Sequence, residues 1–361
     1  MVEPIRYGVI GTGMMGVEHI ENILALDGTE VTALADPHPD SLERAAAVVG
    51  GPPRGSFTDH RDLLASGLCD AVVVASPNMT HADILADVMA VPDLHVLVEK
   101  PLCTTVEECQ RVIEAAADRP GLVWMGLEYR YMPPVARLVR HVAEGGVGRV
   151  RMVAIREHRF PFLHKVDDWN RFNRNTGGTL VEKCCHFFDL MNLLIGSEPV
   201  RVMASGAQDV NHLDERYDGE VPDILDNAYV VVDYADGSRA SLDLCMFAEA
   251  SYHQEEVSVV GDQGKAEAFL PDGTFRAGLR ERGRPNVTSE TVHDDRIAHE
   301  GLHHGASFVE HLLFTEAIRN GAPVEVQLRD GLRSVAIGVA GQRSIEEGRI
   351  VTMDEVLGAS A

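Results

Sequence analysis

The pattern of apolar and polar positions divides the chain into two regions. In the first third, short apolar runs alternate with amphipathic segments of helical period. The predicted strands are residues 5–10, 30–36, 70–77, 95–101 and 122–130. The predicted helices are residues 41–50, 81–90 and 105–118. Repeated strand–helix units at this spacing predict a parallel, doubly wound sheet.

After residue 150, strand-like runs follow one another with few helices between them. These runs are residues 149–157, 199–208, 227–235, 238–247 and 255–261. Ala235–Ser238 and Gly261–Gly264 have the composition of hairpin turns. Residues 275–305 are polar and poorly periodic, which predicts a long loop or arm.

The first predicted strand leads into a glycine pattern typical of dinucleotide binding. Gly11, Gly13 and Gly16 have G-x-G-x-x-G spacing. The first glycine allows a tight turn, the second lets a pyrophosphate approach the backbone, and the third lets the helix pack close to the strand. The helix start, at Met14 and Met15, presents N–H groups to the phosphates. Glycine-rich turns are common, so the motif alone is a weak indication.

Asp36 strengthens this interpretation. It ends the second predicted strand, about twenty residues beyond Gly16, where a carboxylate accepts hydrogen bonds from the ribose of NAD. No arginine follows at once to receive a 2′-phosphate, which favours NAD over NADP. The alternative is that Asp36 is a turn former before Pro37.

Two further predicted strands also end in polar or turn residues. Ser76-Pro77-Asn78 follows one strand and Glu99-Lys100-Pro101 follows the other. Because ligands of parallel sheets bind at the carboxyl ends of the strands, we expect both segments on the same rim as the glycine loop and Asp36.

Composition narrows the classes of protein. A chain of 361 residues fits one large or two medium domains. The net charge of −24 argues against partners such as nucleic acid or an anionic membrane. The six cysteines lack paired CxxC spacing, so neither a disulfide framework nor a zinc ribbon is indicated. With no visible signal peptide or membrane span, a cytoplasmic location is expected.

The ordered motifs resemble those of the Gfo/Idh/MocA oxidoreductases, which include glucose–fructose oxidoreductase and inositol 2-dehydrogenase. The resemblance extends from residue 5 almost to the end of the chain. Besides the glycine loop, it rests on "ASPNMTH" (Ala75–His81), "EKP" (Glu99–Pro101), "GLEYRYMPP" (Gly126–Pro134) and "GGTLVEKCCHFFDL" (Gly177–Leu190). The last segment resembles the family's glycine-rich turn followed by an Asp-x-x-x-His helix.

The resemblance implies an α/β architecture with a Rossmann domain that binds NAD at residues 1–127. A substrate-binding and oligomerisation domain at 128–330 would be built on an open-faced, mostly antiparallel sheet. A C-terminal helix and tail at 331–361 would pack back on the first domain. In the family the free sheet face commonly makes a homodimer, often paired into a tetramer. The implied cofactor contacts are Gly11, Gly13, Met14, Met15, Gly16, Asp36, Ser76, Pro77, Asn78, His81, Glu99 and Lys100.

Three residues are the candidate catalytic groups. Oxidising a secondary alcohol needs a hydride acceptor, a base, and a group that stabilises the developing alkoxide. Lys100, which matches the family's catalytic lysine, is predicted to stabilise the alkoxide and relay the proton. His186 is the candidate base, and Glu182 lies four residues earlier, on the same face of a predicted helix. Taken alone, Lys100 would be a surface lysine and His186 a core histidine.

The sequence departs from the family pattern beside this base. Glu182 stands where the family usually has Asp, and Lys183 where it has a small or apolar residue. Lys183 either points elsewhere on the helix or adds a second cation to the pocket. Further candidates for substrate contact, each more often structural when taken alone, are Tyr129, Arg130, His158, Trp169, Asn170 and Asn173.

Two motifs suggest other chemistry. His299 and His303 have the i,i+4 spacing of metal ligands, but no third ligand accompanies them at motif spacing, and no metal is predicted. Adjacent Cys184 and Cys185 are interpreted as small buried packing residues, because neighbouring side chains on a helix diverge.

The sequence therefore predicts an NAD(P)-dependent oxidoreductase acting on CH–OH groups, with NAD preferred. Its substrate would be a secondary hydroxyl of a sugar, a glycoside or an inositol-like cyclitol. An alternative is a glycoside hydrolase that retains NAD and acts by transient oxidation. A third is a non-catalytic sugar sensor, which the presence of both Lys100 and His186 disfavours.

Overall fold

The computed structural model describes residues 3–281 and 286–358. Residues 1–2 and 359–361, at the ends of the first and last predicted domains, and residues 282–285 of the predicted loop lie outside the described residues. The chain forms two compact units. The first unit is Met1–Glu128, Lys165–Trp169 and Asp295–Leu332, and the second unit is Tyr129–His164, Asn170–Asp294 and Arg333–Ala361.

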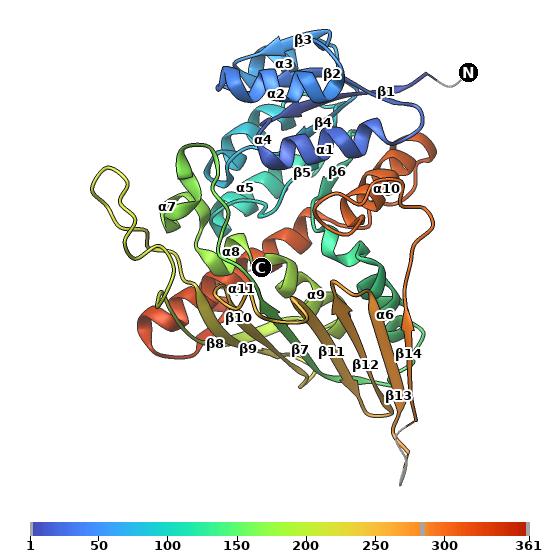
Figure 1. Ribbon diagram of the computed structural model, residues 1–361, viewed down its shortest axis with the longest axis vertical. Helices are drawn as coiled ribbons and strands as arrows, with labels where there is room; N and C mark the ends of the chain where they lie inside the picture. The colour runs from blue at the N-terminus through green and yellow to red at the C-terminus, as the bar shows by residue number, and fades with distance from the viewer. Residues whose placement is uncertain (1–2, 282–285, 359–361) are drawn as a thin grey trace. The chain divides into compact units, whose positions relative to one another are not determined.

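The first unit is built on a six-stranded sheet, counted over the described residues, whose paired strands are all parallel. Its strands are β1 (Ile5–Ile10), β2 (Thr29–Ala35), β3 (Gly55–Phe57), β4 (Ala71–Val74), β5 (His95–Val98) and β6 (Val123–Met125). The order β3-β2-β1-β4-β5-β6 reverses direction between β1 and β4 (Figure 1). The predicted doubly wound sheet is confirmed, with its ligand-binding switch point after β1.

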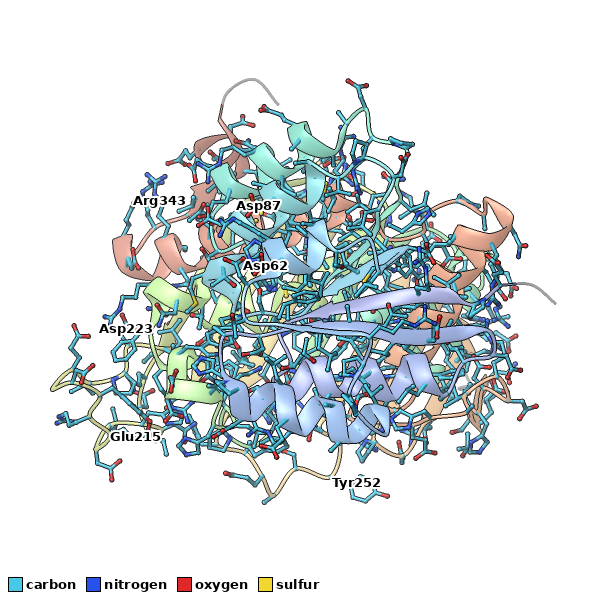
Figure 2. All side chains as sticks on the ribbon, turned by 90° about the horizontal axis from the view of Figure 1, so that it is seen from above. Asp62, Asp87, Glu215, Asp223, Tyr252 and Arg343 are labelled. Atoms are coloured by element: carbon cyan, nitrogen blue, oxygen red, sulfur yellow. The ribbon has the colours of Figure 1, made fainter. Side chains whose placement is uncertain are left out.

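Helices follow most of these strands. They are α1 (Met14–Leu24), α2 (Pro39–Val49), α3 (His60–Ala65), α4 (His81–Met89) and α5 (Val106–Ala116). The unit also contains α10 (Ala306–Asn320), from a later part of the chain. Helix α5 shows why such a segment folds as a helix. Thr105 and Glu108 form a capping box at its start, and its apolar stripe is buried. At the surface, Asp87 of α4 contacts His60 and Arg61 of α3, at 2.8 and 2.9 Å (Figure 2).

The short elements were missed or overextended by the sequence analysis. Strand β3 and helix α3 are only three and six residues long and carry little periodic signal. The predicted strand at 122–130 is wrong beyond Met125, because the chain turns into the 3₁₀ helix η2 (Glu128–Tyr131). A second 3₁₀ turn, η1 (Asn78–Thr80), precedes α4.

The second unit is built on a nine-stranded sheet within the described residues. Its strands are β7 (Val150–His158), β8 (Pro199–Ala207), β9 (Asn227–Tyr234), β10 (Arg239–Cys245), β11 (Glu255–Gly261), β12 (Gly264–Leu270), β13 (Thr274–Leu279), β14 (Asn286–Thr291) and β15 (Val351–Thr352). Their order is β14-β13-β12-β11-β7-β10-β9-β8-β15 (Figure 1). Only β7 and β10 pair in parallel among these strands, so the mostly antiparallel sheet is confirmed.

The two faces of this sheet differ in exposure to solvent. One face alternates into the core, as Val230 and Val232 do, and α6 (Pro133–Ala143) and α9 (Cys185–Ile195) pack on it. The opposite face exposes large apolar side chains, among them Met152, Met203 and Tyr229.

The remaining elements are η3 (Val166–Arg171), α7 (Asn173–Thr176), α8 (Thr179–Glu182), α11 (Leu328–Glu347) and α12 (Met353–Leu357).

The predicted loop at 275–305 is corrected by the structure. Strands β13 and β14 extend the sheet through backbone pairing of Thr274–Leu279 with Asn286–Thr291. Every residue of β14 is exposed, so its side chains show no alternation of apolar and polar positions. Backbone hydrogen bonds hold this edge strand, and a sequence pattern does not record them.

The C-terminal segment has its contacts within the second unit, and the packing of 331–361 on the first domain stays a prediction. Residues from Arg333 onward group with the second unit. Gly338 and Gly341 of α11 lie against Leu180, and Val351 of β15 pairs with Val202 of β8. The two glycines allow the helix to approach Leu180 closely.

Gly338→Ala is expected to lower the free energy of unfolding. Its Cβ would lie 2.7 Å from the backbone oxygen of Leu180, which cannot move freely, and such overpacking costs about 1–3 kcal/mol. Gly341→Ala is the matched control, because the one tight contact of its Cβ, at 2.8 Å, would be with the Cδ1 of Leu180, the end of a flexible side chain. Urea unfolding followed by circular dichroism measures both, and equal stability of the two variants would contradict the prediction.

Candidate active site

The glycine loop after β1 has the geometry of a phosphate cradle. Gly11 has φ +88°, and a Cβ there would lie 2.6 Å from the backbone of Ser76. A Cβ on Gly16 would collide with the carbonyl oxygen of Gly11, so the glycine allows α1 to pack close to the strand. A Cβ on Gly13 would meet nothing within 4 Å. Open space over backbone at the start of an eleven-residue helix suits a pyrophosphate.

Asp36 lies beside this loop at the end of β2. Its Oδ2 accepts hydrogen bonds from the backbone N–H and the hydroxyl of Thr12, at 2.7 and 3.1 Å. Its Oδ1 accepts one from the N–H of His38 at 2.9 Å. The turn-forming and cofactor-binding interpretations are therefore compatible. These three hydrogen-bond donors fix the carboxylate. Because a carboxylate has about four acceptor positions, Asp36 can still accept a hydrogen bond from a ribose hydroxyl.

His81 joins two segments of the predicted rim. Its Nδ1 lies 2.8 Å from the carbonyl oxygen of Pro101, and its Nε2 lies 3.0 Å from that of Ser76. Burial lowers the pKa of His81, although contacts with both carbonyls favour the protonated ring. The imidazole thus ties the loop after β4 to the loop that carries Lys100.

Glu99 anchors the backbone of Lys100. One carboxylate oxygen accepts from the Lys100 N–H at 2.9 Å, and the other lies 2.9 Å from Nε2 of His19. Burial acts to raise the pKa of Glu99, but the hydrogen bond and charge of His19 outweigh it and lower the pKa to about 2. His19 in turn contacts His311 at 2.7 Å, and burial lowers the pKa of that second imidazole. The sequence analysis missed both histidines, since His311 is 292 residues away from its partner.

In the second unit, Gly177 and Gly178 form the predicted tight turn, at φ +79° and +91°. The predicted single helix after them is wrong, because α8 ends at Glu182 and α9 begins at Cys185. Glu182 and His186 are both buried, at opposite sides of this break. The helical i,i+4 argument therefore does not fix their relation.

Cys184 and Cys185 are buried, and all six cysteines are free thiols. The interpretation of this pair as small packing residues is consistent with that environment. The thiol chemistry that the motif could suggest would require access to solvent or to a partner thiol.

The imidazole of His186 stacks flat on the phenol ring of Tyr129. The ring centroids are 3.9 Å apart and the planes differ by 7°. Lys183 Nζ donates to the Tyr129 hydroxyl at 2.8 Å and lies 2.9 Å from Oε1 of Glu157. Of the two possibilities left open for Lys183, the structure supports the one in which it points elsewhere, toward β7.

Arg130 and His158 lie in different surroundings. Arg130 donates to both oxygens of Asp189 in α9, at 2.6 and 2.5 Å. His158 lies on the sheet face opposite to its neighbour Glu157 and contacts Asp243 at 3.0 Å. Because α9 packs on the other face, the structure does not bring His158 together with His186.

The remaining substrate candidates also have internal partners. Asn170 is buried and donates to the Leu163 carbonyl at 3.0 Å. The backbone N–H and the side-chain amide of Asn173 both contact Asp223, at 2.6 and 2.9 Å. Trp169 groups with the first unit, with Lys165 Nζ 5.5 Å from its ring centroid.

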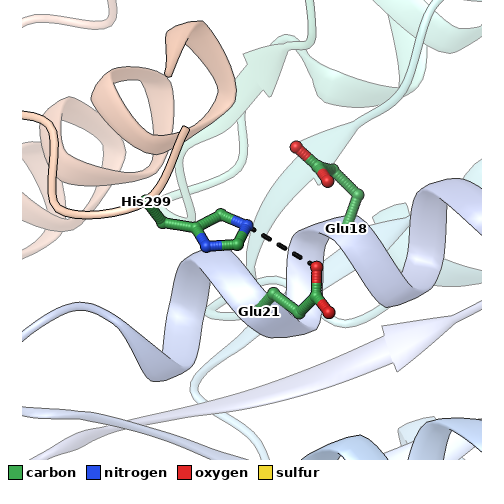
Figure 3. A group of neighbouring side chains, drawn as sticks. All are labelled: Glu18, Glu21 and His299. Carbon is green, nitrogen blue, oxygen red and sulfur yellow. Dashed lines mark ion pairs between the residues drawn. The ribbon is translucent and has the colours of Figure 1, made fainter. Parts of the chain in front are cut away.

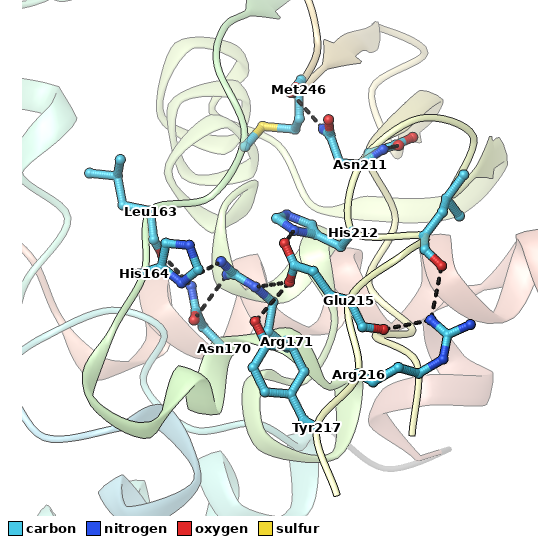
Figure 4. Close-up of polar contacts among 12 residues, drawn as sticks. Leu163, His164, Asn170, Arg171, Asn211, His212, Glu215, Arg216, Tyr217 and Met246 are labelled. Atoms are coloured by element: carbon cyan, nitrogen blue, oxygen red, sulfur yellow. Dashed lines mark hydrogen bonds and ion pairs between the residues drawn. The ribbon is translucent and has the colours of Figure 1, made fainter. Parts of the chain in front are cut away.

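A partly buried polar cluster beside Asn170 was missed by the sequence analysis. Arg171 is fully buried and contacts Asn170 and Glu215 (Figure 4). Tyr217 donates to Glu215 at 2.8 Å, and His212 lies 2.7 Å from it. Burial acts to raise the pKa of Glu215, but hydrogen bonds from His212 and Tyr217 lower it to about 2. The cluster fixes the segment between β8 and β9, which lacks any strand or helix signal.

The histidine pair of the metal-like motif separates in the structure. His299 contacts Glu21 at 3.5 Å, whereas His303 lies 3.7 Å from Glu128. Ligand atoms of Glu18, Glu21 and His299 lie within 4.8 Å of one another (Figure 3). The buried Glu18 carboxylate already accepts from the Leu302 N–H at 3.0 Å. Motif spacing could not reveal the two glutamates, which belong to α1.

Among the described residues, no helix combines the length and apolar character that crossing a membrane requires.

Comparisons with known proteins identify the family. The model "Oxidoreductase family, NAD-binding Rossmann fold" matches residues 5–127, and "Oxidoreductase family, C-terminal alpha/beta domain" matches residues 139–353. The myo-inositol 2-dehydrogenase of Thermotoga maritima is 27% identical over 356 residues, covering 98% of this chain and 100% of the relative. The scyllo-inositol 2-dehydrogenase (NAD(+)) of Bacillus subtilis is 24% identical, covering 98% of each chain.

A solved structure shares the fold. Levoglucosan dehydrogenase in complex with NADH and levoglucosan gives a TM-score of 0.83 at 20% identity, covering 97% of this chain and 100% of that one. The family and the two-domain fold class predicted from the motifs are thereby confirmed. The chain belongs to the Gfo/Idh/MocA oxidoreductase family, with an NAD-binding Rossmann domain and a C-terminal α/β domain.

Proposed function

We propose that this chain is an NAD-dependent dehydrogenase that oxidises a secondary ring hydroxyl of a cyclitol or sugar. The observation that carries the proposal is the phosphate cradle at Gly13 beside the fixed carboxylate of Asp36. The full-length similarity to inositol 2-dehydrogenases supports the substrate class. The glycine loop and the acid fit a dinucleotide, which would supply the hydride acceptor when bound.

Each catalytic group has a defined task in this reaction. A bound nicotinamide would accept the hydride, with its electron pair, from the carbinol C–H bond, so the hydroxyl proton must go to the protein. An imidazole nitrogen of His186 takes that proton, and the ammonium of Lys100 stabilises the developing alkoxide and takes part in the proton relay. Glu182 orients His186 or accepts a hydrogen bond from a substrate hydroxyl.

The structure suggests how the lysine is held for this task. Glu99 fixes the backbone N–H of Lys100, and His81 holds the carbonyl of the following proline. We therefore propose that Glu99 and His81 contribute to catalysis by fixing this loop. The remaining cofactor contacts stay proposals from the motif: Met14, Met15, Ser76, Pro77 and Asn78.

Substrate contacts are proposed more narrowly than the sequence suggested. Tyr129 and Arg130 are engaged with His186, Lys183 and Asp189, so we assign them to shaping the surroundings of the base. Asn170, Asn173 and Trp169 remain candidates for binding polyol hydroxyls and the apolar face of a ring.

The direct test of function is a substrate screen. Purified protein is incubated with NAD+ or NADP+ and with myo-inositol, scyllo-inositol, levoglucosan or glucose, and the absorbance of the reduced cofactor is followed. Net NADH on a free polyol supports the dehydrogenase. Cleavage of a glycoside without net NADH would instead identify the NAD-retaining hydrolase.

Lys100→Met and His186→Gln are each expected to lower kcat about 100-fold or more, because each removes a group that transfers or stabilises charge in the transition state. Lys265→Met is the matched control, since Lys265 is an exposed lysine on β12. Steady-state kinetics of NADH formation measures all three. Unchanged turnover in Lys100→Met would contradict the catalytic assignment.

Asp36→Ala is expected to reduce the preference for NAD+. Losing a charge-assisted hydrogen bond to the ribose raises the KM for NAD+ about ten-fold, and removing the carboxylate lowers the KM for NADP+. Asp40→Ala, at an exposed position in the first turn of α2, is the control. The ratio of kcat/KM for the two cofactors tests this, and an unchanged ratio in Asp36→Ala would rule it out.

We further propose a homodimer, or a tetramer built from it, through the exposed apolar face of the second unit's sheet. Tyr229 is 66% exposed there, and Met152 and Met203 are about half exposed, at 51% and 52%. A cytoplasmic setting fits the six free thiols. The net charge of −24 argues against nucleic acid as a partner.

Tyr229→Asp is expected to shift the assembly toward monomers, because it would bury an unpaired charge in the interface. Leu24→Asp, at an exposed apolar position of α1, is expected to leave the assembly unchanged. Size-exclusion chromatography with light scattering measures the mass of each. A monomeric natural protein would contradict the proposal.

A further inference from the structure

Lys183 is a buried cation in the second unit. Its side chain is 8% exposed, and its Nζ lies 2.9 Å from Oε1 of Glu157, whose side chain is fully buried. Its Nζ also donates a hydrogen bond to the Tyr129 hydroxyl at 2.8 Å. Burying an ammonium costs several kcal/mol unless partners compensate, so its position is set by these contacts.

The surroundings of Lys183 form a balanced charge cluster. Arg159 also contacts Oε1 of Glu157, at 3.1 Å. Glu255 lies directly opposite Glu157 in the β7–β11 register, and burial together with the charge of Glu157 raises its pKa. Two cations thus face two carboxyl groups. Of these two cations, Arg159 alone would remain beside Glu157 if Lys183 were removed.

Tyr129 connects this cluster to the candidate base. Its hydroxyl accepts from Lys183, its ring face stacks on His186, and Phe187 lies edge-on at 5.7 Å and 70°. Lys183 Nζ is 5.1 Å from the centroid of the Tyr129 ring, much farther than from its hydroxyl oxygen. The hydrogen bond, rather than a cation–π contact, therefore dominates this link.

A stacked ring can hold an imidazole only if the ring itself is held. Hydrogen bonding at the hydroxyl end stops Tyr129 from tilting or sliding along the imidazole. The flat stack then restricts rotation of the His186 ring about its last torsion, which is otherwise broad.

We propose that Lys183 is a positioning residue for His186, acting through Tyr129. The catalytic meaning rests on the proposed function, in which His186 is the base. The positioning itself is a property of the second unit and is measurable without turnover. A lysine that only balanced Glu157 would stabilise the fold and leave the imidazole where it is.

Nuclear magnetic resonance of protein labelled with ¹³C in its histidine rings tests the positioning directly. A ring stacked on Tyr129 experiences a ring current that moves the His186 Hε1 resonance upfield. His186→Gln identifies this signal among the sixteen histidines. In Lys183→Met we expect the signal to move downfield or broaden, while Lys265→Met leaves it in place. An unchanged signal in folded Lys183→Met would overturn the proposal.

Three further variants separate positioning from charge balance. Glu157→Gln with Lys183→Met removes both partners, so it avoids leaving an excess buried carboxylate and serves if the single variant fails to fold. Tyr129→Phe keeps the ring and removes only the hydroxyl. Combined with Lys183→Met, it should shift the signal no more than Lys183→Met alone, because both changes cut the same link. Additive shifts would contradict action through Tyr129.

Kinetics with myo-inositol and NAD+ then connects positioning to catalysis. Lys183→Met is expected to lower kcat roughly ten-fold while KM changes by less than about two-fold, as for loss of transition-state geometry. A natural kcat in this variant would overturn the catalytic part of the proposal. If the natural protein fails to turn over any polyol, the proposed function fails, while the resonance test of the Lys183–Tyr129–His186 link still gives its answer.

Discussion

A buried carboxylate is stable only where donors replace the water it has lost, and each unit of this protein holds a candidate catalytic segment by means of one. In the first unit, one carboxylate oxygen of Glu99 accepts a hydrogen bond from the backbone N–H of Lys100, and the other contacts His19. In the second unit, Glu157 holds Lys183 three residues before His186. In both, the catalytic candidate is positioned by an acid that does not itself enter the proposed reaction.

The sequence predicted best those features whose cause is local. The glycine loop could be recognised because a tight turn, an open approach and a close helix contact each require glycine at fixed spacing, and Gly11, Gly13 and Gly16 show these three environments. Hairpins at Ala235–Ser238 and Gly261–Gly264 were equally local, and both join paired antiparallel strands. The strand limits in these regions agree with the predicted runs to within a few residues.

What the sequence could not reveal depends on contacts between distant segments. No sequence pattern relates His19 to His311, because the two histidines are 292 residues apart. Nor does a pattern relate Lys183 to Glu157, because Glu157 belongs to β7, a separate segment of the chain. Strand β14 is fully exposed and carries no alternation. The break between α8 and α9 also escaped notice, since no glycine or proline stands between Thr179 and Ile195 to mark it. These are backbone and long-range effects, which outweigh local periodicity.

The odd pair Glu182-Lys183 then has a different meaning from the one the sequence suggested. A lysine beside the candidate base first suggests a second cation for the substrate, but Nζ is buried against Glu157 and the Tyr129 hydroxyl. Buried ion pairs contribute little net stability, and well-packed apolar residues often replace them without loss. Stability alone therefore explains poorly why a cation, two carboxylates and an arginine lie under the His186 stack. A requirement for fixed geometry at the imidazole explains it better, because a hydrogen-bonded cluster defines one arrangement of Tyr129 where apolar packing would allow several.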